Sequence, residues 1–164
     1  MKMLSVSVIA LMISSAAVAA EKQSETFLKK AIKGNFAEVE MGKLAQQNGQ
    51  SDEVKKFGQM LATDHSAANQ KAMDAAKALN VTAPEGPNAK QKADYDKMSK
   101  MTGAAFDRNF ATHMVADHQK DIAEYKKEAK QSDAAADYAK GQIGTLQTHL
   151  DTAKSLKSSK TSAR

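Results

Sequence analysis

The only two prolines of the 164-residue chain, Pro84 and Pro87, lie three positions apart, so the strongest helix breakers are confined to one place. On both sides of them the sequence is rich in Ala, Lys, Gln, Glu, Leu and Met, which favour helix, and poor in aromatic residues. The chain contains no cysteine, so neither a disulfide nor a thiolate metal ligand can stabilise it. The sequence therefore predicts an all-α domain whose stability comes from its core.

Residues 1–20 have the features of a secretory signal peptide. Lys2 supplies a positive charge, residues 4–13 are apolar, and mostly small residues follow up to Ala20. A small-x-small pattern places cleavage just before or just after Ala20. The alternative is a membrane anchor, but the apolar run is too short to span a bilayer. We therefore expect export to a bacterial periplasm and no transmembrane segment after signal cleavage.

The formal net charge of +5 does not indicate nucleic-acid binding. Lysines are interspersed with acidic residues, and arginine occurs only at Arg108 and Arg164, whereas nucleic-acid surfaces favour clustered basic residues with aromatics. We expect the mature domain over residues 21–158 and a disordered basic tail over residues 159–164. Weak contact of this basic end with anionic membrane surface is one interpretation of its charge, and simple solvation is the other.

Apolar residues recur at three- and four-residue steps and predict four long helices with one short helix between the second and the third. Ser24, Ser51 and Thr102 are expected N-caps, and a cap is also expected within the last turn, over residues 131–133. The long helices are expected over residues 24–47, 51–79, 103–130 and 134–156, and the short one over residues 89–101.

Short connections make each pair of long helices an antiparallel hairpin, whereas the connection between the pairs is long enough to run back along the bundle. We therefore predict a ferritin-like four-helix bundle, in which the second and third long helices run parallel and the crossover between them carries the short extra helix.

All four histidines lie in the middle of predicted long helices. Counting from the two hairpin turns places Glu38 level with His65, and His118 level with His149, to within about one helical turn, or roughly 5 Å. One ligand from each long helix could therefore meet near the middle of the bundle. We predict a metal site formed by Glu38, His65, His118 and His149, with Asp64 and Asp117 as candidates for a supporting role around it.

Three imidazoles and one carboxylate suit zinc or copper better than magnesium or calcium, and iron is a third candidate. The alternative is a structural polar core, in which each histidine bonds an aspartate or a backbone carbonyl and Glu38 pairs with a histidine to fix the helix register. His113 lies five residues from His118, which turns it about 140° away, so we expect it to pair with Asp117 instead.

Other chemistry has weaker support in the sequence. Met98, Met101 and Met114 could supply thioether ligands to copper, although methionine in helices is more often core filler. The chain has no Gly-x-Ser-x-Gly motif, no phosphate-binding glycine-rich loop and no His-Glu-x-x-His motif. An enzymatic activity would therefore have to depend on the predicted metal site, and we expect none without it.

Seven segments of the chain together form a recognisable pattern: residues 27–31, 37–45, 54–57, 64–65, 103–108, 114–118 and 146–150. In this pattern the chain resembles a family of exported bacterial proteins, domain of unknown function 4142, often labelled "predicted outer membrane protein" and grouped with ferritin-like proteins. The resemblance covers about residues 27–156 and implies a ferritin-like bundle and export across the inner membrane, but little about activity.

The ferritin-like group often holds two iron ions through Glu-x-x-His motifs. In this chain Ala62, Val115 and Leu146 occupy the positions three residues before the three candidate histidines, so the bridging carboxylates are missing. The resemblance therefore does not imply iron storage. Glu38 and the three histidines could remain as a reduced site for a single metal ion, or as the remnant of a site that has been lost. Three hypotheses follow. The first is a periplasmic bundle that binds a transition metal or senses envelope conditions, and the second is a non-enzymatic envelope stress or interaction module with a structural polar core. The third, with the weakest support, is a metal-dependent oxidoreductase.

Overall fold

The computed structural model describes residues 15–159, and this part of the chain folds into five α-helices without a β-strand. The prediction of an all-α helical bundle is confirmed. Residues 1–14 of the predicted signal peptide and residues 160–164 of the predicted tail lie outside the described residues. The helices are α1 (Ser15–Asn48), α2 (Asp52–Ala78), α3 (Ala89–Ser99), α4 (Gly103–Glu128) and α5 (Ala134–Ser159).

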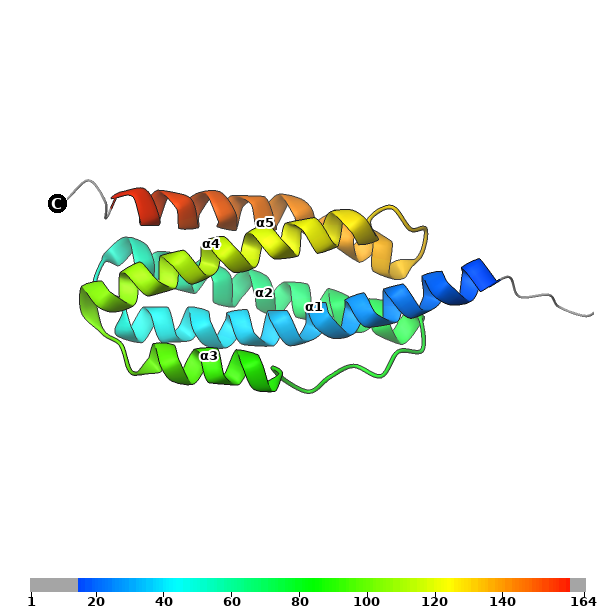
Figure 1. Ribbon diagram of the computed structural model, residues 1–164, viewed down its shortest axis with the longest axis horizontal. Helices are drawn as coiled ribbons and strands as arrows, with labels where there is room; N and C mark the ends of the chain where they lie inside the picture. Colours follow the sequence, from blue (N-terminus) through cyan, green and yellow to red (C-terminus); the bar gives the residue numbers. More distant parts are fainter. Residues whose placement is uncertain (1–14, 160–164) are drawn as a thin grey trace, which may run out of the picture.

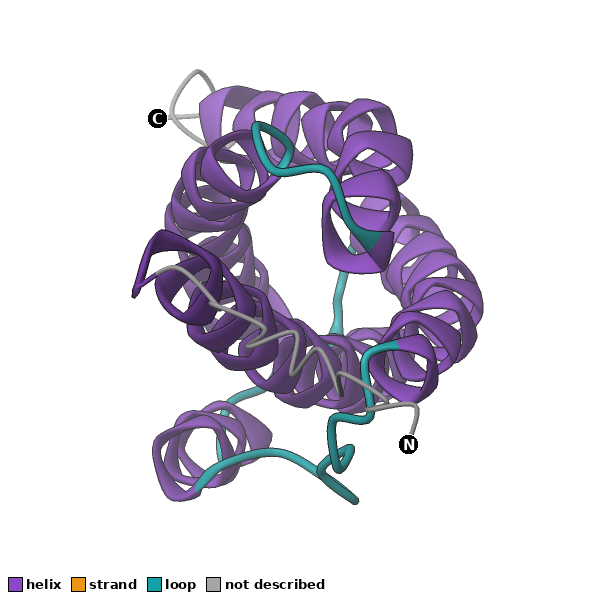
Figure 2. Ribbon diagram, turned by 90° about the vertical axis from the view of Figure 1, so that its right-hand side faces the viewer, coloured by secondary structure: helices purple, strands orange, loops and turns teal. Residues whose placement is uncertain are grey.

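The four long helices form a bundle in which each one packs mainly against two others, and α1 and α5 also make a smaller contact across it. α1 contacts α2 and α4, and α5 contacts α4 and α2. The connection after α2 returns along the bundle before α4 begins, so α2 and α4 run in the same direction (Figure 1). α3 lies in this connection, packs on α1 and stays outside the ring of long helices (Figure 2). Among the described residues, no helix combines the length and the apolarity that crossing a membrane requires.

The helix ends follow the predicted signals in some places and not in others. Ser51 caps α2 by accepting a hydrogen bond from the Val54 amide at 3.4 Å, and Asp133 accepts one from the Ala136 amide at 2.9 Å. Thr102 is the N-cap residue of α4, as predicted, and has an extended backbone, but its side chain makes no cap hydrogen bond.

The predicted cap at Ser24 was wrong, because α1 begins nine residues earlier, at Ser15. The alanine-rich residues before Ser24 have high helix propensity and continue the helix. Ser24 is completely buried, and its hydroxyl lies 2.7 Å from a carboxylate oxygen of Glu128 and 2.6 Å from one of Asp133. This serine therefore fixes the first part of α1 to the turn between α4 and α5.

At the opposite end of the bundle, Asp107 fixes the turn between α1 and α2. Its side chain is fully buried and accepts hydrogen bonds from the backbone amides of Gln50 at 2.8 Å and Ser51 at 3.1 Å. The two hairpins are thus joined at both ends by carboxylates from the second hairpin.

The apolar core is divided into two clusters along the bundle axis. One cluster contains Phe27, Ile32 and Tyr138, and the other contains Met41, Phe57 and Phe110. On α1, α2 and α4, buried polar side chains lie in the sequence between residues of the two clusters, and on α5 the buried His149 lies within one turn of the boundary. Five of these side chains form what we call the polar layer. They are Asn35 and Glu38 on α1, His65 on α2, His118 on α4, and His149 on α5.

The backbones of α1 and α2 touch at a pair of glycines. A Cβ atom on Gly42 would lie 2.5 Å from the carbonyl oxygen of Gly58, and a Cβ on Gly58 would lie 2.5 Å from the carbonyl oxygen of Gly42. Real side chains do not come so close, so both positions require glycine at this helix separation. Asn35 lies seven residues before Gly42, and His65 lies seven residues after Gly58, so the contact also sets the register at the polar layer.

Gly58→Ala should separate the two helices and lower the free energy of unfolding by about 1–3 kcal/mol, the usual cost of overpacking. Gly144→Ala is the matched control, because Gly144 lies on the exposed face of α5 with no atom within 4 Å of an added Cβ. It should stabilise the protein by up to about 1 kcal/mol through helix propensity. Urea unfolding measures both, and equal effects of the two substitutions would contradict the close contact.

Candidate metal centre

Three of the four histidines meet in the polar layer of the bundle. His65 of α2, His118 of α4 and His149 of α5 are 4%, 1% and 1% exposed, and their ring centroids are 5.3–5.7 Å apart. One ring nitrogen from each residue lies within 4.8 Å of the corresponding nitrogens of the other two. Three helices therefore supply one nitrogen each to a common buried point.

The hydrogen bond of His118 fixes its tautomer. Its Nδ1 lies 2.9 Å from the carbonyl oxygen of Met114, one turn earlier on the same helix. Because a carbonyl oxygen can only accept, Nδ1 carries the proton. In the neutral ring, Nε2 is left with a lone pair, and it points toward His149.

His149 is held by a carboxylate from a neighbouring helix. Its Nε2 lies 2.9 Å from an oxygen of Asp64 on α2, and an ionised carboxylate can only accept. Nε2 therefore donates, and Nδ1 of the neutral ring is the atom with the lone pair. A histidine that donates one nitrogen to a carboxylate and offers the other is the usual arrangement around protein-bound zinc.

His65 is oriented from α1. Its Nδ1 lies 2.9 Å from the side-chain oxygen of Asn35, whose amide nitrogen donates to the hydroxyl of Tyr138 at 3.0 Å. That hydroxyl is in turn 3.1 Å from the hydroxyl of Tyr125. Nδ1 of His65 is therefore the donor, and its Nε2 is a buried acceptor without any hydrogen-bond partner.

The three histidines thus donate outward and present acceptors inward. Nε2 of His118 and Nδ1 of His149 are 3.3 Å apart, a distance at which two lone pairs repel unless a cation lies between them. Nitrogen ligands of a tetrahedral zinc ion, at about 2.0–2.1 Å from the metal, are separated by roughly 3.3 Å. The inner nitrogens of His118 and His149 already have this spacing.

Burial keeps the three rings neutral. It lowers the pKa of His65 well below its usual value and that of His118 to about 4, and in both cases the neighbouring histidines lower it further. Burial also lowers the pKa of His149, although Asp64 acts in the opposite direction. Neutral imidazole is the form that binds metal, so at neutral pH these ligands need not lose a proton first.

Two other residues of the predicted site lie elsewhere. Glu38 is not part of the histidine group; it lines a separate pocket between α1, α3 and α4, together with Asp117. Asp117 accepts a hydrogen bond from His113 at 3.1 Å and makes none with the three central histidines among the described contacts. His113 is therefore paired one turn along α4, as its spacing predicted.

Asn35 and Tyr138 are partners of the site that were not predicted from the sequence. The sequence signal that could have identified Asn35 is its position, because it is an amide on the buried face of α1 at the level of His65. Beside His65 and His149 the structure leaves a cavity of about 10 Å³. This is roughly the room of one water molecule or one ion, and far below the several hundred Å³ of a substrate cleft.

Fold and site together define an all-helical bundle with a buried group of three histidines whose free nitrogens face one another. A protein-family model, domain of unknown function DUF4142, matches residues 11–156, and the chain belongs to this family. Comparisons with curated proteins and with solved structures find no match.

The four histidines should behave differently in an NMR titration of the metal-free protein. A hydrogen bond to Asp117 raises the pKa of His113 above its usual value, so this ring should take up its proton above about pH 6.5. The central three should still be neutral at pH values where His113 is already protonated, because their pKa values are lowered, that of His118 to about 4.

The ring ¹⁵N shifts should show a proton on Nδ1 of His65 and His118 and on Nε2 of His149. A central histidine that titrates near pH 6.5 would indicate a proton shared between the rings. That result would contradict the inward-facing acceptors.

Proposed function

We propose that this protein is an exported, ferritin-like bundle of the bacterial periplasm that binds one transition-metal ion, zinc or copper, through His65, His118 and His149. The observation that carries the proposal is the tautomer pattern: each ring donates outward, and three inner nitrogens face one another without a hydrogen atom between them. A structural polar core explains the outward bonds equally well. It does not account for three acceptors that share one buried point.

The choice of metal follows from the ligand atoms. Three imidazole nitrogens without a thiolate suit zinc and copper, whereas the iron sites of ferritin-like proteins depend on bridging carboxylates. Iron is therefore the weakest of the three predicted metals. The small cavity beside the histidines favours binding of an ion over turnover of a substrate.

Two features support the ferritin-like arrangement and the location. α2 and α4 run in parallel because the crossover returns along the bundle, as in ferritin-like connectivity (Figure 1). The N-terminal sequence has the three regions of a signal peptide. Mass spectrometry of the protein isolated from a periplasm should give an N-terminus at or next to Ala20, and an intact Met1 would contradict export by this route.

Elemental analysis of the untagged mature protein tests the metal proposal. We expect about one zinc or copper ion per chain, and its loss in the His65→Ala/His149→Ala variant, because a single imidazole cannot hold the ion. His113→Ala is the control, since it removes a histidine outside the group and should leave the metal content unchanged. A wild-type protein that is metal-free and cannot be loaded with zinc, copper or iron would contradict the proposal.

Asp64→Asn should weaken metal binding by about 10–100-fold, the usual effect of removing the carboxylate that orients a histidine ligand. Asp74→Asn changes an exposed aspartate of the same helix and serves as the matched control. Competition with a chromophoric chelator measures both affinities. Equal affinities of the two variants would show that Asp64 does not support the site.

A further inference from the structure

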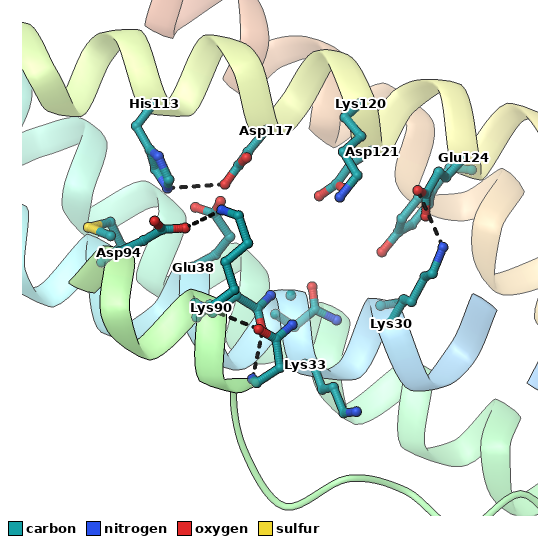
Figure 3. Close-up of a pocket in the computed structure, with 18 of the residues that line it drawn as sticks. Lys30, Lys33, Glu38, Lys90, Asp94, His113, Asp117, Lys120, Asp121 and Glu124 are labelled. Carbon is teal, nitrogen blue, oxygen red and sulfur yellow. Dashed lines mark hydrogen bonds and ion pairs between the residues drawn. The ribbon is translucent and has the colours of Figure 1, made fainter. Parts of the chain in front are cut away.

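A second cluster of ionisable side chains lies in the pocket between α1, α3 and α4, which we call the acidic pocket. It has a volume of about 280 Å³. Glu38 reaches it from α1, and Asp117 and Asp121, one turn apart on α4, face it from the other side (Figure 3). Asp94 of α3 lies at its edge. The histidine centre uses none of these carboxyl groups.

Glu38 is the unusual member of this cluster. Its side chain is only 5% exposed, and its Oε2 atom has no hydrogen-bond partner. Burial, with Asp117 and Asp121 as further causes, raises the pKa of Glu38 well above its usual value. A buried carboxyl oxygen without a donor is costly, and a cation in a pocket lined by other carboxyl groups would offset this cost.

Among the described residues, no ion pair with Glu38 or Asp121 is made by the four lysines that line the acidic pocket, Lys30, Lys33, Lys90 and Lys120. The Nζ atom of Lys90 lies 2.6 Å from a carboxylate oxygen of Asp94, and that of Lys30 lies 3.6 Å from one of Glu124. Each of these two lysines is therefore paired with a carboxylate at the edge of the pocket. Lys120 lowers the pKa of Asp121, but burial and Asp117 outweigh it and raise that pKa to about 7. The carboxyl groups of Glu38 and Asp121 thus stay without a matched cation.

The dimensions of the pocket indicate the kind of cation. In the described part of the chain, the three histidines are the only group close enough to hold a bare ion through three ligands. The carboxyl groups of the acidic pocket are spaced more widely, and its volume accommodates several water molecules of about 30 Å³ each. Magnesium-like ions keep most of their hydration shell and bind through one or two carboxylates.

We propose that the acidic pocket is a second cation site, which binds a hydrated divalent ion of the magnesium or manganese class through Glu38, Asp117 and Asp121. It is separate from the histidine centre in position and in ligand chemistry, with oxygen ligands for a hard ion in one and nitrogen ligands for a softer ion in the other.

Manganese(II) is the probe, because the electron paramagnetic resonance signal of the free ion reports how much is bound. The mature protein should show one saturable site that magnesium competes for. Glu38→Gln and Asp121→Asn should each weaken binding at least tenfold, while Glu40→Gln, an exposed glutamate of the same helix, should not. Lys120→Met should strengthen binding severalfold, because it removes a competing charge and adds no oxygen ligand.

His149→Ala distinguishes the two sites, because it removes a histidine of the metal centre and should leave manganese binding unchanged. This expectation holds whether or not the histidines bind a metal. Absence of saturable manganese binding would overturn the proposal, as would equal binding by wild type and both Glu38→Gln and Asp121→Asn. Displacement by calcium but not by magnesium would also overturn it, because calcium prefers direct oxygen ligands to a retained hydration shell. Circular dichroism verifies that each variant folds.

Discussion

The contact between the backbones of Gly42 and Gly58 is the constraint on which the rest of the structure depends. It brings α1 and α2 together without side chains between them and so permits only a narrow range of registers. One such register places Asn35 beside His65, seven residues away on each helix, where a 2.9 Å hydrogen bond fixes the imidazole ring. The orientation of a ligand in the core therefore depends on two residues that have no side chain.

The polar layer divides a core that would otherwise be continuous and apolar. A buried acceptor without a partner costs about 1–3 kcal/mol, and Nε2 of His65 and Oε2 of Glu38 are both of this kind. The two atoms belong to different clusters, which differ in ligand type and access to solvent. If the two proposed sites bind their cations, this cost is offset in a chain that has no disulfide to compensate for it.

Much of this arrangement could be predicted from the sequence. The periodic apolar residues and the confined prolines indicated the helices, and counting from the hairpin turns brought His65, His118 and His149 to one level. Counting fixes the level of a residue along the bundle but not its rotation about the helix. Asn35 precedes Glu38 by three residues, about 60° short of a full turn, and this difference places the amide at the histidines and the carboxyl in the acidic pocket. The predicted N-cap at Ser24 was wrong because helix signals are local, whereas the partners of this serine, Glu128 and Asp133, are more than 100 residues away in the sequence.

The three central histidines are separated by 53 and 31 residues along the chain, and each comes from a different helix. No local segment and neither hairpin alone contains all three, so the nitrogens converge only when the second hairpin has docked on the first. A nascent or truncated chain that lacks α5 offers no such convergence. Only completely folded molecules would therefore bind a metal ion at this point. A bound ion would then report that the two hairpins have assembled.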